Sequence, residues 1–443
     1  MEYNYMSQAE TEKPTKLFNR NFFLLWQGQT ASRLGNQVFA IALALWIKEA
    51  TGSATIMGLV LMLSSLPAVI LGPIGGTFAD RYSRRKIIIF TDVINGVAFV
   101  ILANLMFFTP DSTQTILIGL FIVSTLNGIL ASFFSPAISA AIPDLVPAQK
   151  LTTANSLGQL STQVTVFFGQ GLGGVLYRLL GAPFLFLING ITYLFSGVSE
   201  SFITVPQTMP EKVDGWRAQM REFRNDIMDG LRYIWRKGGL RELVLVSALL
   251  NFFTAPILLL LPFYVEDFLK VAVDWYGFII AAYGVGALLG YLAAGVIKTS
   301  NRGRATLMIV LILLEAVGYS LLAFVKDPYT ALALSVTGGF AGGYVTVNIT
   351  TLLQFTTPGP IRGRVFGLLG TIAGAITPIA MGISGVIADL LDQNIPLIYF
   401  ACGAIMAALT LLLALSKEFR DYLASEIEPE AAIERVESTL PLR

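Results

Sequence analysis

The chain has 443 residues, of which 54% are hydrophobic and 13% charged, against about 25% charged in ordinary soluble domains. It holds no histidine and one cysteine, Cys402, which excludes histidine acid–base chemistry, an intrachain disulfide and a thiolate metal site, so no cofactor is expected. The net charge of +1 gives no basic surface that would bind nucleic acid.

The segment 1–20 is polar and lacks the apolar core of a cleavable signal peptide. Apolar segments then recur along the chain, each long enough to cross a hydrocarbon core of about 30 Å. They are too long and too uniformly apolar for barrel strands, whereas a helix satisfies its own backbone hydrogen bonds in lipid. We therefore expect an all-α polytopic membrane protein with twelve transmembrane helices, near 22–47, 55–79, 86–108, 114–141, 153–179, 183–204, 242–268, 275–298, 304–325, 330–355, 364–390 and 394–416.

The distribution of basic residues orients these helices. If the N-terminus is cytoplasmic, 25 of the 30 Lys and Arg residues lie on the cytoplasmic side and only four on the other side. Because short cytoplasmic loops carry an excess of Lys and Arg, both termini are expected in the cytoplasm, with the chain in the cell (inner) membrane.

The longest connection divides the segments six and six. In it, Phe223, Ile227, Leu231 and Ile234 recur at helical spacing between charged residues. This pattern favours an amphipathic helix on the inner leaflet, with a solvated linker helix as the alternative. The expected divisions are an N-terminal tail (1–20), a first six-helix bundle (21–204), the cytoplasmic linker (205–241), a second bundle (242–416) and a C-terminal tail (417–443).

The two halves share a pattern of residues at fixed spacing. Gly58 and Gly76 have the same separation along the chain as Gly277 and Gly295. A second set recurs at identical offsets in the two halves, namely Pro147, Leu157, Gly171 and Gly174 in the first and Pro358, Leu368, Gly382 and Gly385 in the second. One such match could arise by chance, but two in corresponding helices indicate duplication and predict two pseudo-symmetric bundles, an architecture of many secondary transporters.

The segment between the second and third helices, GPIGGTFADRYSRRK, is the most informative motif. It resembles the signature loop of the major facilitator superfamily, G-x-x-x-D-R-x-G-R-R/K, with Ser83 at the second glycine. The stretches FLLWQGQTASRLGNQVFAIAL, SPAISAAIPDLVP and DIMDGLRYIW resemble the macrolide-efflux and siderophore-exporter branch of drug:proton antiporters. The resemblance covers essentially the whole chain and implies a two-bundle transporter.

The same loop suggests a cytoplasmic gate. Asp80 stands beside arginines at a helix end and can form charge-assisted hydrogen bonds that hold the inner side shut. The alternative is a basic loop that only fixes orientation, and Asp92 could equally be a plain carboxylate near a helix end. In the second half Thr299 stands where Asp80 would align, so the gate is expected to be asymmetric. The candidate gate residues are Gly76, Asp80, Arg81, Arg84, Arg85 and Asp92.

The first helix carries a polar stripe made of Gln29, Ser32, Arg33, Asn36 and Gln37, at spacings that share one face. An arginine at mid-membrane costs about 2.5–3.5 kcal/mol on insertion scales, so it must face a cavity or a partner. The superfamily resemblance implies that the first, fourth, seventh and tenth helices surround a central cavity. The candidate cavity residues are Arg33, Asn36, Gln37, Asn127, Gln163, Asn251, Tyr344 and Asn348. For Arg33, which would contact an anionic or carbonyl-rich group, the alternative is a structural ion pair or a helix-cap contact, and for the positions outside the first helix it is an interhelical hydrogen bond.

Proton coupling is implied by the resemblance, although two positions depart from it. Asn36 stands where many relatives carry an acidic residue, and Gln170 replaces the proline of a G-P-x-x-G-G motif. The possible proton carriers are Glu315 and Asp92, and Glu315 could instead be neutral and structural.

Three classes of function remain. The first is a secondary active exporter of amphipathic small molecules (drug/macrolide-like or siderophore-like) that works by alternating access and proton exchange. The second is a lysophospholipid flippase of the same superfamily. The third, a membrane enzyme or receptor, is disfavoured because the sequence has no G-x-x-x-x-G-K-[ST] nucleotide loop and no catalytic set. The expected partners are an amphipathic substrate, protons and the lipid bilayer, and the expected state is a monomer.

Overall fold

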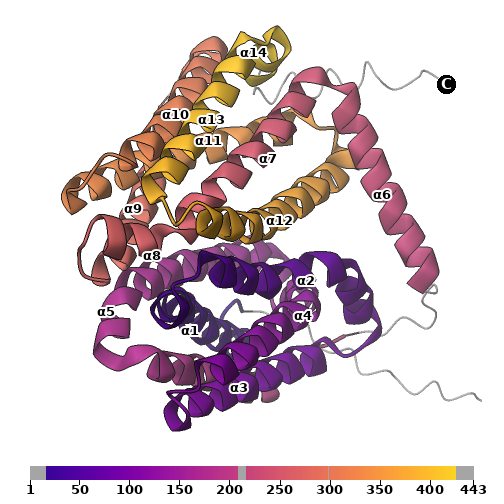
Figure 1. The fold of residues 1–443 in the computed structure, drawn as a ribbon. Coiled ribbons are helices and arrows are strands. Elements are labelled where there is room, and N and C mark those ends of the chain that lie inside the picture. Colours follow the sequence, from indigo (N-terminus) through magenta and orange to yellow (C-terminus); the bar gives the residue numbers. More distant parts are fainter. Residues whose placement is uncertain (1–15, 208–215, 298, 426–443) are drawn as a thin grey trace, which may run out of the picture.

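The computed structural model describes residues 16–207, 216–297 and 299–425, and all regular structure within them is helical (Figure 1). Most of both predicted tails, part of the linker and the side chain of Phe223 lie outside the described residues. The first half contains α1 (Arg20–Thr51), α2 (Ala54–Arg81), α3 (Arg84–Phe108), α4 (Thr113–Leu145), a 3-10 turn (Ala148–Lys150) and α5 (Leu151–Ser201).

The second half contains ten elements. They are α6 (Trp216–Arg236), α7 (Gly238–Leu259), α8 (Leu261–Phe263), a π-helical turn (Tyr264–Phe268), α9 (Asp274–Val296), α10 (Asn301–Leu322), α11 (Pro328–Thr356), α12 (Gly359–Leu390), α13 (Ile395–Leu415) and α14 (Lys417–Leu423). The expected helix near 242–268 is thus interrupted after Leu259, where Leu260 leaves helical geometry (φ −90°, ψ 3°).

Ten helices of the described chain are long and apolar enough to cross a membrane. One of them, Ala148–Ser201, contains Gly181 with φ 76° and ψ 165°, a conformation that only glycine adopts without strain. This kink separates the two pieces of α5 at the point where the sequence predicts two helices. The 32-residue α1 is not among the ten, because its polar stripe lowers its mean hydropathy.

The helices form two bundles, which Figure 1 shows one above the other. In the N-terminal bundle α1 and α3 pack on α5, and α2 packs on α4; in the C-terminal bundle α9 packs on α11, α10 on α13 and α12 on α7. Close approach of backbones depends on glycine: a Cβ atom at Gly75 would lie 1.8 Å from the Ser132 carbonyl oxygen.

The linker helix α6 packs on the C-terminal bundle, at the right of Figure 1. Ile234 is buried there, while the Tyr233 hydroxyl donates a hydrogen bond to the Thr356 carbonyl at 3.2 Å. Asp229 of α6 forms an ion pair with Arg364 of α12 at 3.3 Å. The chain between the bundles is therefore anchored to the second bundle over this helix.

Candidate transport pathway between the two bundles

Several of the repeated glycines lie where the two bundles touch. On α2, a Cβ atom at Gly58 would lie 2.3 Å from the Met381 carbonyl oxygen of α12, and one at Gly385 would lie 2.3 Å from the Ala54 carbonyl oxygen of α2. On α9, a Cβ atom at Gly277 would lie 2.7 Å from the Gln170 carbonyl oxygen of α5. We call these α2–α12 and α5–α9 contacts the two seams.

The bundles diverge away from the seams. The spacing from Gly58 to Gly76, which Gly277 and Gly295 repeat, corresponds to about five full turns of helix, so both members of a pair share a face. A Cβ atom at either Gly76 or Gly295 would nevertheless have no described atom within 4 Å. Gly367, at the same spacing before Gly385, is open in the same way. The seam end is thus the closed end of the molecule and the other is the open end.

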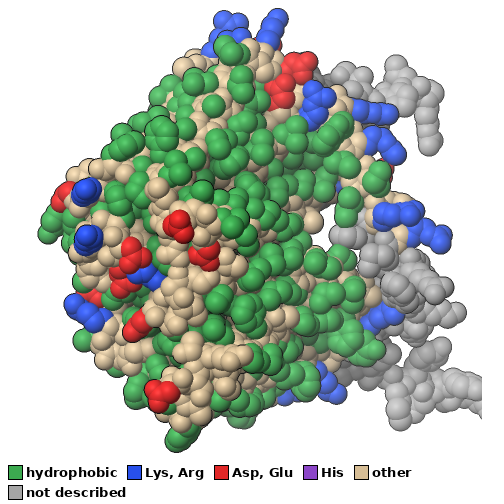
Figure 2. Space-filling view, in the orientation of Figure 1, with side chains coloured by type: hydrophobic (Ala, Val, Ile, Leu, Met, Phe, Trp, Pro, Cys, Tyr) green, Lys and Arg blue, Asp and Glu red, His purple; other side chains and the backbone are tan. Residues whose placement is uncertain are grey.

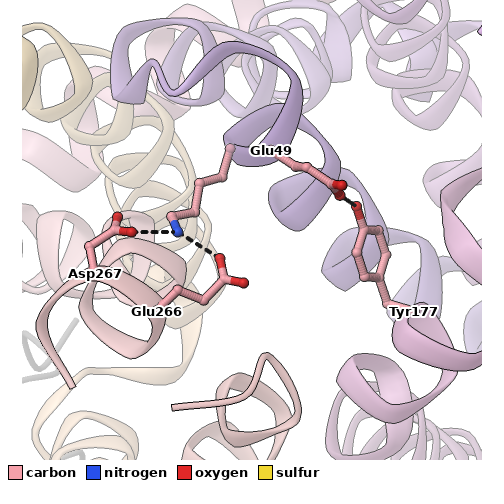
Figure 3. A network of polar contacts seen from close by, with 5 residues as sticks. Glu49, Tyr177, Glu266 and Asp267 are labelled. Atoms are coloured by element: carbon pink, nitrogen blue, oxygen red, sulfur yellow. Dashed lines mark hydrogen bonds and ion pairs between the residues drawn. The ribbon is translucent and has the colours of Figure 1, made fainter. Parts of the chain in front are cut away.

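Ion pairs cross between the bundles at the closed end. The Lys48 ammonium of α1 contacts Glu266 at 2.6 Å and Asp267 at 3.0 Å in the π-helical turn (Figure 3). Arg178 of α5 pairs with Asp274, the first residue of α9, at 2.9 Å. These contacts border a basin of about 1070 Å³ and must separate before this end can open.

Asp389 of α12 adds a third contact at the closed end. Its carboxylate accepts hydrogen bonds from the Ser53 hydroxyl at 2.7 Å and from the backbone N–H groups of Ala54 at 3.0 Å and Thr55 at 2.9 Å. The positive end of the α2 dipole favours an anion at this place. The second bundle therefore caps a helix of the first.

The α1 stripe is hydrogen-bonded to α5. Arg33 donates to the Gly158 carbonyl and the Thr162 hydroxyl, both at 3.1 Å, and forms no ion pair with a described residue. The structure thus gives Arg33 hydrogen-bond partners from α5 in place of the alternative ion pair. Gln37 accepts a hydrogen bond from Gln170 at 2.6 Å.

Two predicted cavity residues are joined through a tyrosine. The Asn36 amide donates to the Tyr193 hydroxyl at 2.7 Å, and this hydroxyl donates to the Asn127 side-chain oxygen at 3.3 Å. Tyr193, which lies in the apolar second piece of α5, was not among the predicted cavity residues. It is the only tyrosine in that piece, which is the one signal that could have drawn attention to it.

The other predicted cavity residues are not brought to the α1 stripe by any hydrogen bond within the described chain. Gln163 is exposed on α5, and Asn251 is exposed on α7 with its amide bonded to the Ser247 carbonyl at 2.8 Å. Tyr344 lies in the core of the C-terminal bundle with 1% of its surface exposed. Asn348 donates to the Tyr344 carbonyl at 2.9 Å.

The predicted gate residues take separate partners at the open end. Arg84 pairs with Asp144 of α4 at 2.6 Å, and Arg85 donates to the Ser201 carbonyl at the end of α5. Asp80 is exposed and has no hydrogen bond or ion pair within the described chain. Asp144 was missed by the sequence analysis, although it lies in the quoted stretch SPAISAAIPDLVP.

Three carboxyl groups lie inside the bundles, two in the first bundle and one in the second. Asp92 packs on α5 at Gly197, where a Cβ atom would lie 3.6 Å from the Asp92 Cβ atom, about one turn before Glu200, which was not among the predicted site residues. A carboxylate inside the apolar segment 183–204 was the available signal. In the C-terminal bundle, Glu315 accepts hydrogen bonds from the hydroxyls of Tyr319 at 3.1 Å and Tyr283 at 3.3 Å.

Known proteins resemble this chain along most of its length. The family described as Transmembrane secretion effector matches residues 14–438. Macrolide efflux protein A of Streptococcus pyogenes is 24% identical over 377 residues, which cover 84% of this chain and 90% of that protein. The multidrug efflux pump Tap of Mycolicibacterium fortuitum is 25% identical over 368 residues, which cover 80% and 86%.

Solved structures share the fold. A mutant of the nucleoside transporter NupG has a TM-score of 0.69 at 12% identity, covering 92% of this chain and 99% of that chain. A bacterial homologue of the iron transporter ferroportin, in an inward-facing state, has a TM-score of 0.66 at 16% identity, covering 90% and 99%. With the signature loop and the two helical bundles, these likenesses confirm the predicted superfamily: the chain belongs to the Transmembrane secretion effector family, in the efflux branch of the major facilitator superfamily.

Proposed function

We propose that this protein is a secondary active transporter that exports amphipathic small molecules, drug/macrolide-like or siderophore-like, across the inner membrane by alternating access. The main support for the proposal is a difference between the two ends of α2 and of α9. On each helix, one end of the face contacts the opposite bundle and the other end does not. Gly58 and Gly277 touch the opposite bundle, whereas Gly76 and Gly295 have open space before them. Two rigid bundles joined at one end can rock about a central site and expose it to either side.

The proposed topology has twelve crossings with both termini in the cytoplasm. It counts α1 as a crossing, since 32 residues at about 1.5 Å each reach about 48 Å, and it divides α5 at Gly181. In Figure 2 Lys and Arg side chains gather at the right, the side of α6, while acidic side chains are more frequent at the left. The positive-inside rule then assigns the open end to the cytoplasm.

On this assignment the described conformation is inward-open, ready to take cargo from the cytoplasm. The Asp80 carboxylate, which has no partner among the residues that the structure describes, supports the gate proposal, in which its charge-assisted bonds form only when the cytoplasmic side closes. Arg84 and Arg85 already brace the loop through α4 and α5, so closure needs to recruit only a partner for Asp80.

The proposed substrate site centres on the α1 stripe. Arg33 uses one of its terminal nitrogens on α5, which leaves further donors for an anionic or carbonyl-rich group. Asn36, Gln37 and Asn127 add amide groups around it. The relatives named for macrolide and multidrug efflux support a large amphipathic cargo, and we propose export by one monomer in exchange for protons.

A lysophospholipid flippase is the second candidate, and one groove favours it. A groove of about 720 Å³ between α2 and α3 has an apolar wall that includes Phe78 and Phe90, with Arg81 and Lys86 at its edge. An acyl chain against the apolar wall and an anionic headgroup at the basic edge would fit this distribution.

Uptake into inverted membrane vesicles tests the proposal, because their outer surface is the cytoplasmic face. We expect uptake of a radiolabelled macrolide, erythromycin, that is abolished by a proton uncoupler and absent from vesicles without the protein. Uptake of a labelled lysophospholipid alone would favour the flippase. Uptake of neither compound, in vesicles shown to hold folded protein, would contradict both.

A further inference from the structure

A pair of carboxyl groups lies sealed inside the N-terminal bundle, between α1, α3 and the second piece of α5. Asp92 has 1% of its surface exposed and Glu200 has 0%. Asp92 lies about two turns into α3, or about 12 Å along the helix from the open end. Neither group lines the space between the bundles.

The pair has fewer hydrogen-bond donors than its oxygens require. Glu200 Oε1 accepts from the Gln29 amide at 2.6 Å and from the Ser196 hydroxyl at 3.3 Å. Glu200 Oε2 and Asp92 Oδ2 are buried and receive no donor from the described chain. Asp92 packs on α5 at Gly197, where a Cβ atom would lie 3.6 Å from the Asp92 Cβ atom, and Gly197 is about one turn before Glu200, so the two side chains meet between α3 and α5. Two carboxylate oxygens can bond only when one of them carries a proton.

The surroundings supply no compensating cation. No described Lys or Arg forms an ion pair with either carboxyl group, and the nearest arginines along α3 are used elsewhere, Arg84 by Asp144 and Arg85 by the Ser201 carbonyl. The other groups that face the pair are neutral: Gln29 from α1, and Tyr193 and Ser196 from α5. Two uncompensated negative charges in a buried site are strongly disfavoured, so a proton shared by the pair is the stable form.

We propose that Asp92 and Glu200 form the proton-binding site that couples this transporter to the proton gradient. Uptake of one proton forms one O–H bond and changes the charge of the pair from −2 to −1. When the helices around it open to water, that proton passes to water and the charge returns to −2. This inference rests on the proposed function, since coupling requires transport.

Two contacts connect the pair to the α1 stripe. Gln29, which donates to Glu200, is one turn from Arg33 on the same face of α1. Tyr193, which accepts from Asn36, is one turn from Gly197, the α5 residue against which Asp92 packs. A shift of α1 on substrate binding would therefore move a donor of Glu200 and change how firmly the pair holds its proton.

Glu315 provides a matched contrast in the other bundle. Its carboxylate accepts two tyrosine hydroxyls, at 3.1 and 3.3 Å, and it has no second carboxyl group beside it in the described chain. The tyrosines stabilise the group without a shared proton, so we assign coupling to the pair.

The test uses the full-length protein in proteoliposomes and two assays. Counterflow, the exchange of radiolabelled erythromycin outside for unlabelled erythromycin inside, needs no proton gradient. Accumulation driven by a pH gradient needs coupling of transport to proton movement. We expect D92N and E200Q to keep counterflow and to lose driven accumulation by about tenfold or more, while E315Q keeps both. Wild-type accumulation in D92N and E200Q, with loss in E315Q, would overturn the proposal.

A second measurement stands apart from any substrate. The infrared carbonyl band of a protonated carboxylic acid should be present in purified wild-type protein and altered in D92N and E200Q, but unchanged in E315Q. If the carbonyl band is unaltered in E200Q, Asp92 and Glu200 do not share a proton, and the proposal is overturned even if E200Q retains counterflow. If the wild-type protein shows no erythromycin counterflow but the infrared changes appear as expected, erythromycin is not a substrate and the proton-binding pair is still supported. Should E200Q fail to fold, Q29A removes a donor while leaving both carboxyl groups, and should shift the pH at which the band disappears.

Discussion

The carboxylate of Asp389 in α12 accepts a hydrogen bond from the backbone N–H of Thr55 in α2 at 2.9 Å, so a residue of one bundle caps a helix of the other. The cap also satisfies the N–H of Ala54, which would otherwise lack a partner at the start of the helix. Because these two helices belong to different bundles, the cap holds only while the bundles meet at this end. It therefore favours the conformation described here over one that opens at the closed end.

Asp389→Asn should weaken closure at this end. The substitution removes the negative charge and one acceptor oxygen, and a lost cap costs about 1 kcal/mol, which is about fivefold in a conformational equilibrium. We expect a cysteine placed at Val273, beside the α5–α9 seam, to react about fivefold faster with a membrane-impermeant maleimide in whole cells. The native Cys402 is buried and should add little background.

Asp392→Asn is the matched control for this measurement. Asp392 is exposed, lies slightly further along the chain and makes no hydrogen bond to α2. Its positive φ of 50° is well suited to asparagine. Equal acceleration by both substitutions would show that charge near the seam, not the cap, controls opening.

The seam glycines should respond in the opposite way to the glycines of the open end. A Cβ atom at Gly58 would overlap the Met381 carbonyl, and overpacking typically costs about 1–3 kcal/mol, so Gly58→Ala should lower the melting temperature of the purified protein by a few degrees. Gly76→Ala meets open space and gains up to about 1 kcal/mol of helix propensity, so it should leave the melting temperature equal or higher.

A transport assay gives a second test of Gly76→Ala. Alternating access requires the open end to close, and an alanine at Gly76 would then meet the opposite bundle. Gly76→Ala should therefore slow erythromycin counterflow despite its stable fold. Undiminished counterflow in Gly76→Ala would mean that this face never closes against its neighbour.

The all-helical class and the place of the break in α5 could be predicted because both depend on local pattern. The kink at Gly181 falls between the predicted segments 153–179 and 183–204, and the repeated glycine spacing marks the faces that carry the seams. Which helix each glycine touches could not be predicted, since Gly58 meets Met381 from the opposite half of the chain.

The polar contacts within the N-terminal bundle were less predictable, because they too join residues that are far apart in the sequence. Asn36 and Asn127 were expected to share a cavity, but their connection runs through Tyr193, whose position depends on how the second piece of α5 packs. Asp92 was noted for its place in α3, whereas its partner Glu200 lies three helices further along the predicted order and was not noted. Burial of both is a tertiary property that no local pattern reports.

Asp80→Asn tests the gate. In the described conformation Asp80 has no partner within the described chain, so the neutral residue should leave this state and its affinity for cargo nearly intact. Closure of the cytoplasmic side would lose a charge-assisted hydrogen bond, and turnover should fall about tenfold. Binding of erythromycin to purified protein and counterflow in proteoliposomes measure the two quantities. Strong loss of binding with a normal cycling rate would contradict the gate assignment.

Arg33→Ala should have the reverse effect. Arg33 bonds α5 through a single terminal nitrogen, so its removal costs the fold two hydrogen bonds to neutral groups but removes a charged donor from the proposed substrate site. A hydrogen bond from a charged group contributes about 1.5–3 kcal/mol, so erythromycin affinity should fall about tenfold or more while the rate at saturating cargo is kept. Arg33→Lys, which retains the charge and loses the planar fork, should recover part of that affinity. If both variants bind erythromycin as tightly as the wild type, Arg33 serves only to join α1 to α5, and the substrate site must be sought elsewhere between the bundles.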